Sequence, residues 1–272
     1  MARLRFVTLN AWGGRCWPAL DAWLPRCEAD VLGLQEVTRA PLRAPPWLRY
    51  VDPSRTLDQR SDLFGDVSAA LPAYQPCFAP ATRGALIDPN GREWASEHGI
   101  ATWVAPHLAV TERWQGFVHG AYRHDGWGPE PVPRTFQAMR VVEPTTGRSV
   151  LLAHLHGLRD PMGKGDTPAR AAQARRIADV VAGIAAPDEP VALGGDLNLL
   201  PGSETFDILA GIGLTDLVVA RGIADTRTPL YAKPERHANY MLVNDRVRVV
   251  AFDALAEPVV SDHRPLVLDL EV

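Results

Sequence analysis

Short apolar runs, each bounded by polar or turn-forming residues, recur from one end of the chain to the other. Runs of about four to eight such residues are typical of buried strands. They predict strands at residues 4–9, 31–34, 100–104, 110–117, 135–142, 149–155, 191–193, 239–243, 247–252 and 266–270. Strands are therefore expected throughout the chain.

Apolar residues spaced by three and four positions predict the helices. One helix is expected at 17–27, where Pro25 would shorten it, and short helices are expected at 64–71 and 206–209. A longer helix should begin after a capping Thr167, with an apolar stripe that reaches residue 185. The residues placed away from this stripe are Arg170, Gln173 and Arg176.

Aperiodic stretches rich in proline, glycine or arginine predict loops at 41–60, 122–133 and 159–168. The 24 prolines and 22 glycines among 272 residues imply many turns and short elements. The strands are too dense for a regularly alternating doubly wound sheet. We therefore predict a single domain over 1–272 of mixed α/β class, in which two sheets pack together and helices cover their outer faces.

Charge and cysteine content narrow the function classes. A formal net charge of -4 argues against non-specific wrapping of a nucleic-acid backbone, although a local basic groove is compatible with it. Residues 1–10 lack the apolar core of a signal peptide, and no stretch approaches the roughly 20 apolar residues of a membrane span. The three cysteines lack metal-ligand spacing, so we expect free thiols and a reducing, cytoplasmic location.

Candidate chemistry lies where the predicted strands end. The strand at 191–193 runs into Gly194 and Gly195 and then offers Asp196 and Asn198. If the strand continues through both residues, their side chains share a face, roughly 7 Å apart, so one phosphate group could touch both. An acid beside an amide suits phosphoester hydrolysis, because the acid can hold a metal or take a proton from water while the amide donates to a phosphoryl oxygen. The alternative is an Asp-Leu-Asn turn that caps the next helix.

Other predicted strand ends carry polar residues of the same kind. They present Asn10, Glu36 and His154, and Asp262 with His263. Taken alone, Glu36 is equally compatible with a solvated strand end, and a lone histidine such as His154 is more often structural than catalytic. Their joint order along the chain is what indicates one site.

Five short motifs spread over nearly the whole chain carry a family resemblance. They are TLNAWG at 8–13, LQE at 34–36, AHL at 153–155, GDLN at 195–198 and SDH at 261–263. In this order they resemble the deoxyribonuclease-I-like endonuclease/exonuclease/phosphatase superfamily. The resemblance implies a four-layer sandwich of two β-sheets flanked by helices. It also implies hydrolysis of phosphoesters in nucleic acids, inositol phosphates, sphingomyelin or protein-to-DNA linkages, with magnesium or manganese.

The same resemblance implies a metal site. Glu36 corresponds to the main metal ligand, helped by Asn10, and Asp262 corresponds to a further ligand. Oxygen donors together with waters suit Mg²⁺.

The resemblance also implies the catalytic roles. Asp196 would orient or deprotonate the attacking water, and Asn198 would donate to the phosphate. His154 and His263 would stabilise charge on the phosphoryl oxygens.

One position departs from the family pattern. The family places an aspartate before a tyrosine ahead of the last strands, and here Asn239 precedes Tyr240. In the family that aspartate supports the histidine of the last motif. We expect Asn239 to lie beside His263 and to hold the imidazole by a neutral hydrogen bond, which stabilises imidazolium much less than a carboxylate does. The alternative is that Asn239 ends the strand and bonds to the backbone.

The loop after His154 supplies the candidate substrate contacts. It carries His156, Arg159 and Lys164, the last between two glycines. We expect these side chains to meet an anionic group of the substrate near the metal. The alternative is a mobile surface loop with solvated charges.

Together these features predict a metal-dependent phosphoester hydrolase, a phosphodiesterase or a phosphatase, in which a metal-activated water attacks phosphorus in line. The expected partner is a phosphoester substrate, with nucleic acid, and hence a nuclease activity, slightly favoured over a lipid or a small phosphoester. Because TLNAWG is similar to the start of neutral sphingomyelinases, a sphingomyelinase-like enzyme or a small-molecule phosphatase is the alternative. A phosphate-binding protein with weakened catalysis is the alternative of another class, and Asn239 is its one indication.

Overall fold

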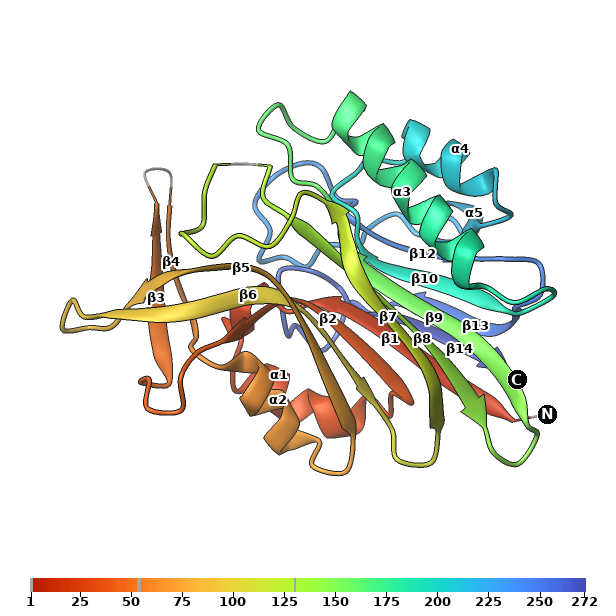
Figure 1. The fold of residues 1–272 in the computed structure, drawn as a ribbon, viewed down its shortest axis with the longest axis horizontal. Helices are drawn as coiled ribbons and strands as arrows, with labels where there is room; N and C mark the ends of the chain where they lie inside the picture. The colour runs from red at the N-terminus through yellow and green to blue at the C-terminus, as the bar shows by residue number, and fades with distance from the viewer. Residues whose placement is uncertain (1, 53–54, 130) are drawn as a thin grey trace.

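The computed structural model describes residues 2–52, 55–129 and 131–272 (Figure 1). Residues 53–54 and 130, which fall in the loops predicted at 41–60 and 122–133, lie outside the described residues, as does Met1. The described chain forms two β-sheets packed face to face, with helices on both outer sides. The predicted four-layer α/β sandwich is confirmed.

The first sheet has eight strands in the described chain, in the order β13-β14-β1-β2-β6-β5-β3-β4. They are β1 (Arg3–Asn10), β2 (Val31–Arg39), β3 (Trp47–Asp52), β4 (Arg55–Arg60), β5 (Gln75–Ile87), β6 (Glu93–Val104), β13 (Arg248–Ala254) and β14 (Leu266–Glu271). β1 and β2 pair in parallel, and the remaining pairs of this sheet are antiparallel.

The second sheet has six strands in the same described residues, in the order β11-β12-β10-β9-β8-β7. They are β7 (Ala109–His119), β8 (Arg134–Glu143), β9 (Arg148–His156), β10 (Val191–Asp196), β11 (Thr215–Asp216) and β12 (Asn239–Val243). Here β9 and β10 pair in parallel. Each sheet therefore contributes one parallel pair near its middle.

Helices form the two outer layers (Figure 1). α1 (Ala19–Trp23), which continues as a 3-10 turn at Leu24–Arg26, and α2 (Leu63–Ala70) cover the first sheet. α3 (Pro168–Ile184), α4 (Glu204–Ala210) and α5 (Leu217–Ala220) cover the second. The break of the first helix at Pro25 agrees with the sequence prediction. None of the described helices has the length and apolar character needed to cross a bilayer.

β1 is covered on both faces, which explains its largely apolar sequence. Phe6 packs into the core between the sheets, together with Phe136 of β8 and Leu193 of β10. The next residue, Val7, points to the opposite face and packs with Leu63 of α2. Successive side chains of a strand alternate between faces, so a central strand with two covered faces is apolar at almost every position.

The loop predicted at 41–60 is wrong, because β3 and β4 pair there as an antiparallel hairpin. Within β3, Leu48 is buried while the flanking residues are exposed or half-buried. A strand with so little buried surface shows no apolar run. The hairpin projects beyond the sandwich at one end of the molecule, where no second sheet covers it (Figure 1).

β5 occupies residues 75–87, where the apolar pattern predicts no strand, and β6 begins at Glu93 instead of residue 100. Pro76 and Pro80 lie inside β5 and hide it from a pattern search. In the described pairing β5 meets β3 at a single position, Arg49 opposite Ile87, so most of one edge makes no ladder. Proline is tolerated on such an edge, because it has no N–H to donate.

Candidate active site

The parallel pairs bring the predicted residues to one edge of the sandwich. Asn10 ends β1, and Asp196 ends β10. Asp196 lies opposite His156 of β9 on one side and opposite Asn239 of β12 on the other. The carboxyl ends of parallel strands are the usual place for a ligand site in α/β proteins.

The two glycines before Asp196 allow this convergence. A Cβ at Gly194 would come within 2.8 Å of the Thr8 side chain on β1, so the two sheets approach closely at this point. Gly195 has a φ of 140°, a conformation that L side chains rarely adopt. Both positions therefore require glycine for Asp196 to reach the end of β1.

Asn10 joins a carboxylate from each sheet. Its Nδ2 donates to Oε1 of Glu36 at 3.1 Å and to Oδ2 of Asp196 at 2.9 Å, and its Oδ1 accepts from the backbone N of Trp12 at 3.0 Å. Ionised carboxylates can only accept, so the amide nitrogen must face them. In this orientation Asn10 positions the two acids with its N–H groups, and its role as a metal ligand stays a prediction.

Glu36 faces the site because β2 changes register. The pairing with β6 shifts between Leu34 and Val37, and Glu36 has a φ of 56°. Gln35 consequently points into the core and Glu36 turns toward Asn10. A left-handed backbone at a residue other than glycine costs about 1–3 kcal/mol and is often found at functional sites.

Neighbouring side chains act on the ionisation of Glu36. Burial alone would raise its pKa, but His156 and His98 together with the Asn10 amide outweigh that effect and hold the pKa below its ordinary value. Glu36 is therefore ionised at neutral pH.

Asp196 is the most enclosed acid of the site, with 1% of its surface exposed. Its Oδ1 accepts from the backbone N of Asn198 at 2.9 Å, and its Oδ2 lies 3.6 Å from Nε2 of His156 and 3.5 Å from Nε2 of His263. Burial opposes ionisation, yet the imidazoles, Arg227 and the Asn10 amide hold the pKa of Asp196 well below its ordinary value. This carboxylate is therefore charged and fixed in direction.

Asn198 follows in a left-handed conformation, with a φ of 56°. Its Nδ2 donates to the carbonyl of Gly157 at 3.3 Å, which leaves its second amide hydrogen free for a ligand. The next helix, α4, is capped by Ser203. The alternative of a helix-capping Asp-Leu-Asn turn is therefore wrong.

The expected contact between Asn239 and His263 is present. Oδ1 of Asn239 lies 2.6 Å from Nδ1 of His263, and Nδ2 of Asn239 donates to the carbonyl of Arg264 at 3.2 Å. A carbonyl can only accept, so the amide orientation is fixed and Nδ1 of His263 must carry the proton. Nε2 is then an acceptor, and it accepts from Nη1 of Arg227 at 2.5 Å.

Arg227 is the residue of the site that the sequence does not reveal. It is 5% exposed, donates through Nη1 to Oδ2 of Asp262 at 2.8 Å as well as to His263, and stacks 3.9 Å from the ring centroid of Tyr231. It lies in the loop between α5 and β12, outside every motif. No local pattern marks it, because only the fold brings this loop beside the last motif.

Asp262 shares this environment. Burial raises its pKa to about 7, Arg227 opposes the rise, and the nearby charges of Glu36 and Asp196 reinforce it. Three acids thus influence one another at this edge of the sandwich.

The two histidines of β9 differ in their surroundings. Nδ1 of His154 lies 3.2 Å from Nε2 of Gln35, and its Nε2 lies 2.8 Å from Oγ1 of Thr102 and 3.0 Å from Oε1 of Gln137. These are core contacts between the sheets, so His154 is not among the side chains gathered around Asp196. His156, two residues further, is.

The two predicted loop cations also separate. The ammonium of Lys164 donates to the carbonyl of His237 and lies 5.6 Å from the ring centroid of Tyr231. Burial lowers the pKa of Lys164 to about 8, with Arg227 reinforcing the fall and Asp196 opposing it. Arg159 is exposed on the outside of the same loop. The structure therefore brings Lys164 to the site and leaves Arg159 in solvent.

The acids fit a hard divalent cation. Among the described residues, no three or more histidine, cysteine, aspartate or glutamate side chains form a ready-made metal site. Magnesium does not need one, because it keeps several waters and is bound through one or two carboxylates and the substrate phosphate. Glu36 is charged and only partly covered. Burial is the main cause of the raised pKa of Asp262, and the charges of Glu36 and Asp196 that add to it are the kind that a cation offsets. Glu36 and Asp262 therefore fit Mg²⁺ or Mn²⁺.

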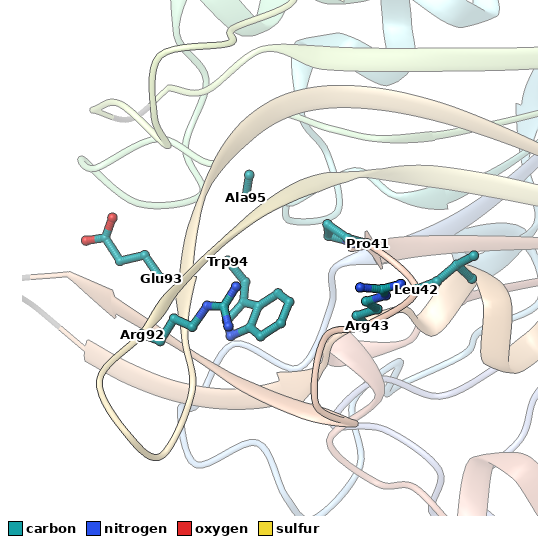
Figure 2. Close-up of a pocket in the computed structure, with 7 residues that line it drawn as sticks. All are labelled: Pro41, Leu42, Arg43, Arg92, Glu93, Trp94 and Ala95. Carbon is teal, nitrogen blue, oxygen red and sulfur yellow. The ribbon is translucent and has the colours of Figure 1, made fainter.

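Two open grooves lie away from these acids, on the arm formed by the projecting β3–β4 hairpin and the adjoining ends of β5 and β6 (Figure 1). The first, of about 610 Å³, is lined by Pro41, Leu42, Arg43, Arg92, Glu93, Trp94 and Ala95 (Figure 2). In it the guanidinium of Arg92 lies 4.2 Å from the ring centroid of Trp94, and Leu42 is 99% exposed. The second, of about 540 Å³, continues toward Arg39 and Glu97. None of the predicted site residues lines either groove.

The two-sheet sandwich, with an acid, amide and imidazole cluster at the ends of its parallel strands, defines a class of fold and site. Residues 7–263 match the model of the Endonuclease/Exonuclease/phosphatase family. The chain belongs to this family. A comparison with curated proteins finds no match.

Solved structures share the fold. A family member from Beutenbergia cavernae is 19% identical, with a TM-score of 0.70 over 100% of this chain and 72% of that one. A mannosyl-6-phosphatase from Bacteroides thetaiotaomicron is 16% identical, with a TM-score of 0.69 over 99% of this chain and 100% of that one. The catalytic domain of human Nocturnin with bound sulfate is 17% identical, with a TM-score of 0.61 over 99% and 93%. At these identities the likeness shows the fold alone.

Proposed function

We propose that this chain is a metal-dependent phosphoester hydrolase with its centre at Glu36, Asp196 and His263. The observation that carries the proposal is the Asn10 amide, which ties Glu36 from one sheet to Asp196 from the other. A fold with no catalytic role would gain little from burying two charged acids side by side, because burial of charge is costly. Membership of the family supports phosphoester hydrolysis as the reaction class.

Glu36 and Asp262 would hold the metal. When bound, Mg²⁺ or Mn²⁺ supplies positive charge to a phosphoryl oxygen. Asn10 would keep Glu36 in place, because its amide is anchored by the backbone of Trp12.

Asp196 would accept a proton from the attacking water. It is ionised, and hydrogen bonds from Asn10 and Asn198 fix its two oxygens. His156 and His263 face its Oδ2 and would limit the directions from which water approaches.

Asn198 would donate to an oxygen of the phosphate that is cleaved, and Arg227 would donate to an anionic group beside it. His263 is neutral near pH 7, because burial lowers its pKa to about 3, with Asp196 opposing and Arg227 reinforcing that shift. Its Nε2 accepts from Arg227 and so fixes the direction of the guanidinium. Preorganised donors of this kind stabilise the charge that develops during in-line attack.

A small phosphoester is our preferred substrate class. The formal net charge of -4 disfavours a polyanion, and a mannosyl-6-phosphatase shares the fold over the whole length of both chains. A nucleic-acid phosphodiesterase is the second candidate. The observation in its favour is the set of arginines that line the two grooves of the arm, Arg39, Arg43, Arg83 and Arg92.

A panel of phosphoesters tests the proposal. Single- and double-stranded DNA, RNA, a phospholipid dispersion and sugar phosphates are each incubated with Mg²⁺, with Mn²⁺ and with EDTA. We expect turnover of at least one small phosphoester that EDTA abolishes. Absence of turnover on every substrate with both metals, or turnover that EDTA leaves unchanged, would refute a metal-dependent hydrolase.

A further inference from the structure

The loop that carries Lys164 is fixed from below by a buried arginine. Arg170, in the first turn of α3, donates to the carbonyls of Gly163 and Gly165 on either side of Lys164. It also donates to the carbonyls of Leu158 at 3.2 Å and Asn198 at 3.1 Å. This is why Arg170 is buried, against the prediction that it lies on the polar side of the helix.

Gln173 adds to the same anchoring and corrects the same prediction. It is buried, and its Oε1 accepts from the backbone N of Leu158 at 3.1 Å. A loop held through several of its own backbone groups is positioned before any ligand arrives. The alternative of a mobile surface loop with solvated charges does not describe Lys164.

Lys164 is a half-buried cation without an acid of its own. Its ammonium donates to the carbonyl of His237 and lies over Tyr231. In the described residues the ion pair of the site joins Arg227 to Asp262, and none joins Lys164 to a carboxylate. Two further N–H bonds of the ammonium are available, because an ammonium has three.

Arg227 flanks the same ring from 3.9 Å and has unused hydrogen-bonding capacity. Its Nε is buried and has no partner in the described structure. Its hydrogen bonds to Asp262 and His263 both run through Nη1. Lys164 and Arg227 therefore meet over Tyr231, while Arg236, 6.0 Å from the same ring, is paired with Asp225. An anion over this ring would find two cationic donors.

We propose that Lys164 and Arg227 form a second phosphate subsite over Tyr231, beside the hydrolytic centre, so that the preferred substrate is a small compound with two neighbouring phosphate groups. This rests on the proposed function. One phosphate would be cleaved at Asp196, and the other would be held by the two cations. Lysine and arginine donors both suit phosphate, which offers several acceptor oxygens.

Calorimetry with two probes tests the subsite. Orthophosphate carries one phosphoryl group, and methylenediphosphonate carries two that cannot be hydrolysed apart. Both are titrated at one fixed concentration of free Mg²⁺ into wild type, Lys164→Met, Lys164→Arg and Lys233→Met. Lys233 is the matched control, because it is the other lysine of the chain and is exposed on the Tyr231 loop.

We expect wild type to bind the diphosphonate about ten times more tightly than orthophosphate, the scale of one added charged contact. Lys164→Met should lose that preference and keep its orthophosphate affinity, while Lys164→Arg and Lys233→Met should keep both. Equal wild-type affinities for the two probes would overturn the subsite. Equal losses of diphosphonate affinity in Lys164→Met and Lys233→Met would also overturn it, because the overall positive charge of this region, and not a specific site, would then explain the binding.

Two outcomes separate this proposal from the function on which it rests. If phosphoesters are hydrolysed but the diphosphonate shows no preference, the subsite is wrong and the hydrolase stands. If no phosphoester is hydrolysed but Lys164 still selects the diphosphonate, the subsite stands and the hydrolase is wrong. Tight binding of a 5′-phosphorylated dinucleotide that depends on Lys164, without a preference for the diphosphonate, would assign the cations to a nucleic-acid backbone and overturn the proposal.

Discussion

Replacing Asn239 with aspartate would put a carboxylate oxygen where an amide oxygen now lies, 2.6 Å from Nδ1 of His263. The side chains have nearly the same volume, so packing around the buried position should be kept. Two things change: a charge appears beside an imidazole that is neutral near pH 7, and the hydrogen bond from Nδ2 to the carbonyl of Arg264 is lost. Burial holds the pKa of His263 at about 3, with Asp196 opposing and Arg227 and Lys164 reinforcing the shift.

The size of the expected change follows from this one hydrogen bond. A hydrogen bond between neutral groups contributes about 0.5–1.5 kcal/mol net, and one to a charged group contributes about 1.5–3 kcal/mol. The difference, about 1.4 kcal/mol, corresponds to about one pKa unit. The sign is upward, because the new carboxylate favours imidazolium over imidazole. We therefore expect the pKa of His263 to rise by about one unit in Asn239→Asp.

The assay is a histidine titration by NMR, combined with the pH profile of kcat/KM on the best substrate. Where protonation of His263 controls a limb of that profile, the limb should move to higher pH by the same amount. Asn244→Asp is the control, since Asn244 bonds to the backbone of Val191 and Glu189 and does not contact His263. The reasoning is refuted if the His263 titration stays in place in Asn239→Asp, or if it moves equally in the control.

Two further predictions concern other parts of the structure. His154→Ala should lower the free energy of unfolding by about 1–3 kcal/mol, because core hydrogen bonds are lost, and should keep kcat within a few-fold. His156→Ala should keep the stability and lose most of the turnover. Loss of turnover without loss of stability in His154→Ala would support the catalytic role predicted for His154. Burial raises the pKa of Asp216, the cap of α5, to about 6. The folded state therefore holds a proton that the unfolded state releases near pH 4. The free energy of unfolding should consequently fall as the pH rises from about 4 to 6. Asp216→Asn keeps the cap and should remove this pH dependence. In denaturant titrations the free energy of unfolding of the variant, relative to wild type, should therefore increase by about 2–3 kcal/mol between pH 4 and 7.5. A difference between the two proteins that stays constant with pH would contradict the raised pKa of Asp216.

The strands of the sandwich could be predicted because two covered faces demand apolar residues. From Phe6 to Asn10 every position of β1 is buried, and the sequence shows this as a largely apolar stretch. The projecting strands have no second sheet to bury against. Strands such as β3 and β4 are held in place by backbone pairing. Because backbone pairing does not require apolar side chains, it leaves no apolar pattern in the sequence.

The site shows the same division. Asn10 and Asp196 could be predicted because each ends a strand within a short motif, and parallel pairing brings strand ends together. The sequence predicts Glu36 at a strand end, but β2 continues to Arg39, and Glu36 follows the last residue of β2 that pairs with β1. Arg170 and Arg227 could not, because each acts through a loop whose position depends on the whole fold. The register between β9 and β10 also decides that His156, and not His154, meets Asp196. None of the sequence motifs encodes this register.

The most direct test of the hydrolytic centre is a single substitution, Glu36→Gln, followed by magnesium calorimetry and turnover on the same preparation. The change removes a ligand charge and keeps the side-chain volume, and the amide can still meet Asn10. Circular dichroism should show an intact fold. The account predicts weaker magnesium binding and a loss of turnover by about two orders of magnitude, because a main ligand is lost. Unchanged magnesium affinity and unchanged turnover in Glu36→Gln would contradict it and remove Glu36 from the metal site.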